Sequence, residues 1–301
     1  MPSIPLPDEP SGLPLDGPSG LPPDEPPALP AVAPDATAPY GGHPDQIIDF
    51  YAPRGERSGA APLVVVLHGG AWRAPYDRQH VTPFADFLAR RGFAVANVEY
   101  RRGSSLPHQD ASGPLAGRWP ETFDDVAAAL DALPHLAKEA LPEADVRRTV
   151  VTGHSAGGQL ALWAASRHVL PEGSPWRLDA PPPLRGVVAL APIADFEEAV
   201  RRGVCGGAVV QLLGGQDAYE ERRPYADPAA LLPTGIATAV VQGRFDTTVP
   251  HEVAEAYAEA AAKAGEVVGL TLLEDVGHFP LIDPAADACA VVAEEIAQLA
   301  Y

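Results

Sequence analysis

Short runs of β-branched and other apolar residues alternate with longer stretches rich in alanine and leucine over most of this chain. This alternation restricts the fold more than any other feature, because parallel strands need a crossover of a dozen or more residues between them. Most of the runs are almost continuously apolar, which is typical of strands covered on both faces. The predicted strands are residues 46–51, 63–67, 93–99, 149–152, 186–190, 239–242 and 269–273.

The stretches between these runs have the three- and four-residue apolar spacing of amphipathic helices. We therefore expect an α/β fold with a mostly parallel sheet of about seven or eight strands and helices on both faces. The predicted helices are residues 82–91, 121–140, 155–168, 251–264 and 284–299.

One connection is too long for a simple crossover. Residues 196–235 follow the run at 186–190, which is the fifth of the runs above and would be the sixth strand of an eight-stranded sheet. We interpret them as a cap-like insert, because excursions of this length usually elaborate a functional site. Within the insert, residues 208–213 are apolar and would offer a substrate an aliphatic wall. Four arginines of the insert would either hold a substrate carboxylate or pair with nearby glutamates on the surface: Arg201, Arg202, Arg222 and Arg223.

The N-terminal segment differs in composition from the rest of the chain. Residues 1–39 hold thirteen of the 35 prolines and six acidic residues, but no basic or aromatic residue. Such a segment lacks the apolar surface needed for a core, so we predict a disordered proline-rich tail, followed by a catalytic domain over 40–301. The tail is interpreted as a solvated spacer, with docking to a proline-recognising partner as the alternative.

Charge and composition exclude several function classes. The chain has 40 acidic and 21 basic residues, a net charge of −19, which repels nucleic acid and anionic lipid. We find no uncharged apolar run of about 18 residues and no signal-peptide pattern, and therefore expect no membrane span and a cytoplasmic location. The two cysteines are far apart in sequence, so neither a disulfide framework nor a metal cluster is predicted.

A nucleophile motif follows the strand at 149–152. Residues 153–158 read GHSAGG and lead directly into a helical pattern. A Gly-x-Ser-x-Gly sequence between a strand and a helix is typical of a sharp turn that exposes a reactive serine. Ser155 is therefore the predicted nucleophile.

A serine hydroxyl needs a general base, and the base needs a third group that fixes its tautomer. Asp246 and His278 each follow a predicted strand, and the carboxyl ends of parallel strands meet at one edge of a sheet. We predict His278 as the base and Asp246 as the acid. Asp195, which also follows a strand, remains the alternative acid, unless it caps the start of the insert.

The strand at 63–67 ends in a glycine-rich loop, residues 68–72, with the sequence HGGAW. Glycines in this place let backbone N–H groups approach a substrate oxygen, so we predict an oxyanion hole formed by Gly69, Gly70 and Ala156. Aromatic side chains near this loop are candidate walls of the substrate pocket, with core packing as the alternative for each: Trp72, Tyr76 and Trp119.

Together these motifs resemble the serine-dependent α/β-hydrolases over about residues 46–300. Within that superfamily they are similar to carboxylesterases related to hormone-sensitive lipase and to prolyl-oligopeptidase-like esterases. The HGGAW sequence also resembles the HGGxW motif of kynurenine formamidases. One departure is Ala71, which stands where the esterase HGGG motif has its third glycine.

The resemblance implies the α/β-hydrolase fold and a hydrolase that needs no metal or organic cofactor. We expect Ser155 to cleave a small carboxylic ester through an acyl-enzyme intermediate. The alternatives are an arylformamidase acting on N-formylkynurenine or a similar amide and, in another class, a non-hydrolytic binding protein with this fold. The expected partner is a small molecule, and a homodimer is left open.

Overall fold

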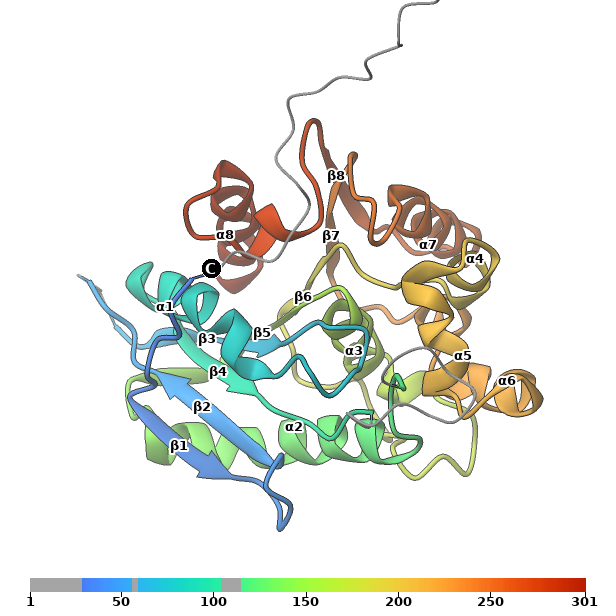
Figure 1. Ribbon diagram of the computed structural model, residues 1–301. Coiled ribbons are helices and arrows are strands. Elements are labelled where there is room, and N and C mark those ends of the chain that lie inside the picture. Colours follow the sequence, from blue (N-terminus) through green and yellow to red (C-terminus); the bar gives the residue numbers. More distant parts are fainter. Residues whose placement is uncertain (1–28, 56–58, 104–114) are drawn as a thin grey trace, which may run out of the picture.

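The computed structural model describes residues 29–55, 59–103 and 115–301. These residues form one eight-stranded sheet in the order β1-β2-β4-β3-β5-β6-β7-β8 (Figure 1). Strands β1 and β2 are antiparallel to their neighbours, and every later pair is parallel. The strands are β1 (Ala36–Pro39), β2 (Ile47–Tyr51), β3 (Ala61–Leu67), β4 (Ala94–Val98), β5 (Ala144–His154), β6 (Gly186–Leu190), β7 (Thr238–Gly243) and β8 (Gly269–Leu273).

Helices fill the connections between the strands. The α-helices are α1 (Thr82–Arg90), α2 (Glu121–Ala140), α3 (Ala156–Ala165), α4 (Phe196–Arg201), α5 (Ala208–Leu212), α6 (Gln216–Arg222), α7 (His251–Lys263) and α8 (Asp287–Ala300). Short 3₁₀ helices are η1 (Arg78–Val81), η2 (Arg167–Val169), η3 (Val204–Gly206), η4 (Arg223–Tyr225), η5 (Pro228–Leu231) and η6 (Phe279–Ile282). The expected mostly parallel sheet covered by helices is confirmed.

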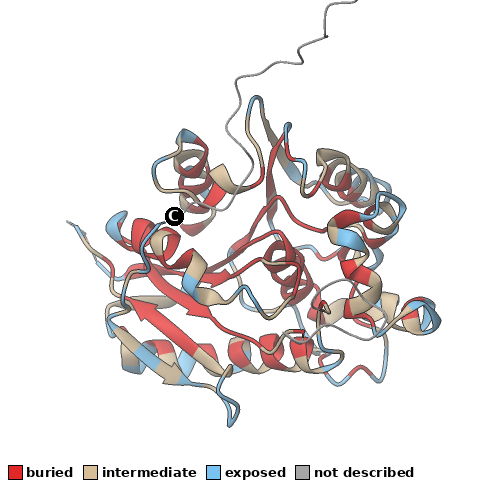
Figure 2. Cartoon of the chain, in the orientation of Figure 1, coloured by how far each residue is buried: buried red, intermediate tan, exposed pale blue. Residues whose placement is uncertain are grey.

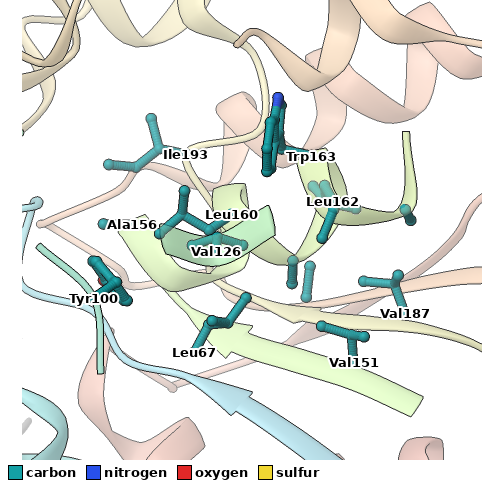
Figure 3. Packing of buried hydrophobic residues seen from close by; sticks show 14 of the residues in the cluster. Leu67, Tyr100, Val126, Val151, Ala156, Leu160, Leu162, Trp163, Val187 and Ile193 are labelled. Carbon is teal, nitrogen blue, oxygen red and sulfur yellow. The ribbon is translucent and has the colours of Figure 1, made fainter. Parts of the chain in front are cut away.

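The alternation of side chains along the central strands divides the core into two layers. In β3, Leu63, Val65 and Leu67 face a cluster that includes residues of α2, α3 and α7, whereas Val64 and Val66 face a second cluster with α1 and α8. Figure 2 shows the resulting band of buried strands between the helices. Figure 3 shows the first layer, where Leu67 lies beneath Leu160 of α3 and Val151 lies beneath Leu162. The sheet is therefore buried on both faces, as its apolar runs predicted.

The predicted boundary between tail and domain at residue 40 was wrong, because residues 36–39 form strand β1 at the edge of the sheet. The chain packs on the domain even earlier, since the backbone N–H of Val32 donates to Thr82 Oγ1 at 3.0 Å and its carbonyl accepts from Tyr51 Oη at 3.0 Å. The remainder of the predicted tail, residues 1–28, lies outside the described residues.

The long connection after β6 folds into α4, α5, α6 and three 3₁₀ helices, and in Figure 1 it lies beside α3 and α7. Two side chains of α3 donate hydrogen bonds to this connection and hold it against the helix. Gln159 Nε2 donates to the carbonyl of Ala226, and Trp163 Nε1 donates to the carbonyl of Tyr225, each at 2.8 Å. Within the described residues, no helix is both long and apolar enough to cross a membrane.

Candidate active site

Ser155 lies in the sharp turn that joins β5 to α3. Its backbone has φ 58° and ψ −117°, a region that residues with a side chain rarely adopt and that is typical of strained functional turns. The glycines on either side are sterically required. A Cβ on Gly157 would lie 2.0 Å from the carbonyl oxygen of Leu67, and one on Gly153 would lie 2.2 Å from the carbonyl oxygen of Gly157. The turn therefore forms only because strand and helix meet at glycines.

Asp246 and His278 lie at the same edge of the sheet, after β7 and β8, and both are buried. His278 Nδ1 lies 2.7 Å from Asp246 Oδ2. A carboxylate only accepts, so Nδ1 carries the hydrogen and the neutral ring has its lone pair on Nε2. Asp246 is fixed in turn by the backbone N–H groups of Thr248 and Val249, at 2.9 and 2.7 Å, and by Gln242 Nε2 at 3.0 Å.

The ring of His154, next to Ser155 in sequence, packs on His278 with 4.2 Å between ring centroids. Burial, followed by the proximity of His278, holds the pKa of His154 well below its ordinary value, so this ring is neutral. Its Nε2–H donates to the backbone carbonyl of His278 at 2.9 Å. His154 therefore positions the backbone of His278, a function that its place inside the motif did not reveal.

The loop after β3 has an unusual backbone. Gly70, Ala71 and Trp72 have φ values of 103°, 51° and 55°, so three successive residues adopt left-handed conformations. A Cβ on Gly69 would lie 3.3 Å from Ser155 Cβ, which puts this glycine against the turn that holds Ser155. Ala156 is the first residue of α3, where backbone N–H groups have no helical acceptor. Of the predicted donors, Gly69 and Ala156 therefore adjoin Ser155, and Gly70 lines the same cavity as the serine.

A buried network of hydrogen bonds links this loop to the residues that directly follow β4. His68 stacks on Tyr100, with ring centroids 4.2 Å apart, and its Nδ1 lies 2.9 Å from the carbonyl of Gly69. His68 Nε2 contacts Glu99 Oε1 at 2.8 Å. Burial acts to raise the pKa of Glu99, but His68, Arg102 and a backbone N–H outweigh it and lower this pKa to about 2.

A cavity of about 270 Å³ opens beside the serine. Of the three aromatic residues predicted to form walls of the substrate pocket, Tyr76 lines this cavity. The described lining residues are Gly70, Ala71, Arg73, Tyr76, His80, His154, Ser155, Cys205, Thr248, His278 and Phe279.

The prediction that Trp72 and Trp119 line the pocket was wrong. Trp72 is fully buried, with its ring against Phe196, because the left-handed backbone turns the side chain into the core. Trp119 packs in an aromatic cluster with Phe123 and Trp176. Trp72 therefore packs within the core and Trp119 packs against it, which was the stated alternative for both residues.

The alternative acid, Asp195, caps α4, where its side chain accepts from the N–H of Glu198 at 2.9 Å. The insert arginines also lie outside the described cavity lining. Arg201 and Arg202 pair with Glu198, Arg223 pairs with Glu197 and Asp227, and Arg222 donates to a backbone carbonyl. The four arginines therefore fit the second interpretation, in which they pair with nearby groups on the surface instead of holding a substrate carboxylate.

Several lining residues were missed from the sequence. Thr248 and Phe279 adjoin Asp246 and His278, so their proximity to the motifs was a usable signal. Arg73 likewise follows the HGGAW sequence directly. His80 and Cys205 gave no such signal, because the paths of two loops bring them to the cavity. Of residues 196–235, Cys205 alone is among the described lining residues, so residues 208–213 do not form the expected aliphatic wall.

A protein-family comparison identifies the group to which this architecture belongs. The BD-FAE family model matches residues 48–260. The chain belongs to the BD-FAE family. This membership, together with the fold, confirms the resemblance to α/β-hydrolases of the carboxylesterase type.

Two relatives of this BD-FAE chain are named as esterases. It is 24% identical over 272 residues to a probable isoprenylcysteine alpha-carbonyl methylesterase, ICMEL1, of Oryza sativa subsp. japonica, covering 85% of this chain and 60% of the relative. It is 26% identical over 284 residues to Esterase LipC of Mycobacterium tuberculosis, covering 85% and 64%. The chain thus spans less than two thirds of the length of these relatives.

A solved structure shares the fold. A truncated carbohydrate esterase from gut microbiota superposes with a TM-score of 0.70 and 18% identity, covering 88% of this chain and 96% of that one. At this level of identity the likeness concerns the fold.

Proposed function

We propose that this chain is a serine hydrolase that cleaves a small carboxylic ester through an acyl-enzyme intermediate. The observation that carries the proposal is the 2.7 Å contact between His278 Nδ1 and Asp246 Oδ2, in a site where His278 and Ser155 line one cavity. A base that is oriented by a buried carboxylate beside a serine on a strained turn is the arrangement that activates a hydroxyl nucleophile.

In the proposed reaction, Ser155 Oγ attacks the ester carbonyl carbon while His278 Nε2 accepts the hydroxyl proton. Asp246 keeps the hydrogen on Nδ1 and stabilises the imidazolium that forms. The N–H groups of Gly69, Gly70 and Ala156 stabilise the negative oxygen of the tetrahedral intermediate. His278 then protonates the leaving alcohol, and water attacks the acyl-enzyme by the same route to release the acid and restore Ser155.

The first test replaces the members of the triad. We expect Ser155→Ala and His278→Ala each to lower kcat by roughly 10⁴- to 10⁶-fold without unfolding the protein, because triad members act as a unit. Hydrolysis of p-nitrophenyl esters of increasing chain length measures the rate, and circular dichroism measures folding. Retention of more than about a tenth of the wild-type rate by Ser155→Ala would contradict the mechanism.

The acid is tested by a matched pair of variants. Asp246→Asn should lower kcat by roughly 10⁴-fold, since an amide cannot hold the same tautomer of the imidazole. Asp195→Asn, which changes only a helix cap, should have a small effect on kcat. The reverse ranking would transfer the acid role to Asp195. Labelling of Ser155 by a fluorophosphonate separates the hydrolase from a binding protein with this fold.

Arylformamidase activity is the second candidate, and Arg73 is the observation that favours it. This arginine comes from the loop after β3 and lines the cavity, and a guanidinium is suited to bind a carboxylate such as that of N-formylkynurenine. The two activities differ in a direct comparison. A kcat/KM for N-formylkynurenine far above that of every ester would identify the formamidase.

A further inference from the structure

His80 lies in η1, thirteen residues after β3, and the proposed mechanism gives it no function. It nevertheless lines the same cavity as Ser155 and His278. We infer that His80 determines substrate specificity by accepting a hydrogen bond, through Nε2, from a hydroxyl group of the bound ester. This inference rests on the proposed esterase activity and adds the chemical class of its substrate, a hydroxyl-bearing ester.

The hydrogen-bonding direction of His80 follows from its contact with its own turn. Nδ1 lies in hydrogen-bonding contact with the backbone carbonyl of Asp77. A carbonyl only accepts, so Nδ1 carries a hydrogen. Burial, followed by the nearby charge of His68, lowers the pKa of His80 to about 4, so the ring is neutral at pH 7. The neutral ring with hydrogen on Nδ1 has a lone pair on Nε2 and accepts there.

Neighbouring rings hold His80 beside the proposed oxyanion hole. Tyr76 and His68 contact it edge to face, with ring centroids 6.1 and 5.7 Å away. Tyr76 lies against Gly70, where an added Cβ would be 2.2 Å from Tyr76 Cβ. Gly70, Tyr76 and His80 therefore form one wall of the cavity, next to the backbone that would bind the ester oxygen.

This wall favours one kind of substrate group. Arg73, which also lines the cavity, can only donate, whereas Thr248 and Tyr76 can donate or accept by rotating a hydroxyl. Nε2 of His80 carries no hydrogen, so it can only accept a hydrogen bond. A substrate hydroxyl satisfies this acceptor, whereas a hydrogen or methyl group in its place leaves the acceptor without a partner, which costs binding energy.

The experiment compares hydroxylated esters with their unsubstituted partners. Methyl 2-hydroxybutyrate and methyl 3-hydroxybutyrate are each compared with methyl butyrate, and methyl 4-hydroxybenzoate with methyl benzoate, by pH-stat. The measured quantity is the ratio of the two kcat/KM values in wild type, divided by the same ratio in a variant. This double ratio cancels both the intrinsic reactivity of the esters and the fraction of folded enzyme.

We expect His80→Leu to lower the preference for the best hydroxy ester by roughly 3- to 10-fold, mainly through KM, as loss of one hydrogen bond predicts. His80→Phe, which keeps an aromatic ring beside Tyr76, should show the same loss and provides the result if His80→Leu fails to fold. His80→Gln keeps an acceptor oxygen and should retain part of the preference. His135→Leu, on the exposed face of α2, is the control and should leave the ratio unchanged.

Two outcomes would overturn the inference in distinguishable ways. A double ratio within twofold of one for every ester pair would show that His80 does not bind the hydroxyl, while the esterase function stands. A wild-type protein that hydrolyses none of the esters would overturn the proposed function and the inference together.

Discussion

Glu99 accepts four hydrogen bonds in the buried network that contacts the loop after β3, and Glu99→Gln tests how that loop is held. The carboxylate accepts from His68 Nε2, the N–H groups of Arg78 and Tyr100, and Arg102 Nη1, at 2.7 to 3.0 Å. Glutamine has a single acceptor oxygen, so its NH₂ group would face donors that have lost their acceptor. We therefore expect a large loss of stability from a nearly isosteric change.

The magnitude follows from the pKa of Glu99. Burial acts to raise this pKa, but His68 and Arg102 outweigh burial and lower it from 4.5 to about 2. Because the folded-state pKa is the lower one, the stabilisation is complete above about pH 4.5 and is lost as the pH falls towards 2. A difference of about 2.5 units corresponds to about 3 kcal/mol at pH 7, and roughly half of this remains at pH 3.

Urea unfolding followed by circular dichroism measures this difference. The free energy of unfolding of wild type should exceed that of Glu99→Gln by about 3 kcal/mol at pH 7, and the gap should narrow at pH 3. Glu274→Gln removes an exposed partner of Arg244 and should cost less than about 1 kcal/mol at either pH. A gap below about 1 kcal/mol at pH 7, or one that is independent of pH, would refute the reasoning.

Two further predictions concern the turn between β5 and α3 and the N-terminal segment. Gly157→Ala should abolish most turnover and lower the melting temperature, since the new Cβ would lie 2.0 Å from a backbone oxygen of β3; unchanged activity would show that strand and helix can separate. Deletion of residues 1–28 should leave the melting temperature within about 2 °C, whereas deletion of residues 1–38, which removes most of β1, should lower it by several degrees. Equal melting temperatures for the two truncations would show that β1 adds nothing to the stability of the sheet.

The buried strands and helices were predictable because the apolar pattern of each one lies within its own residues. The runs at 186–190 and 269–273 coincide with β6 and β8, and the stretch at 121–140 coincides with α2. Strand β1 was missed because its sequence, ATAP, contains a proline and lies in a proline-rich acidic segment. A four-residue edge strand tolerates this composition, since one side of its backbone needs no partner strand.

The positions of the candidate site residues were predictable where they depend on the order of the strands, and were missed where they depend on the paths of loops. Ser155, Asp246 and His278 each follow a strand of a parallel sheet, so the order of the strands alone brings them to one edge. The direction of Trp72 depends on a left-handed backbone conformation that nothing in its sequence announced. His80 reaches the cavity only because the loop after β3 folds back over Gly70.

The loop after β3 links the stability of the fold to the proposed chemistry. Its left-handed conformations at Ala71 and Trp72 are unfavourable for residues with a side chain, so the surrounding structure has to enforce them. The Trp72 ring buried against Phe196 and the Glu99 network supply that constraint. Loosening the network should therefore move the N–H groups of the proposed oxyanion hole. For Glu99→Gln we expect kcat to fall together with stability, whereas Ser155→Ala should lose kcat and keep its stability.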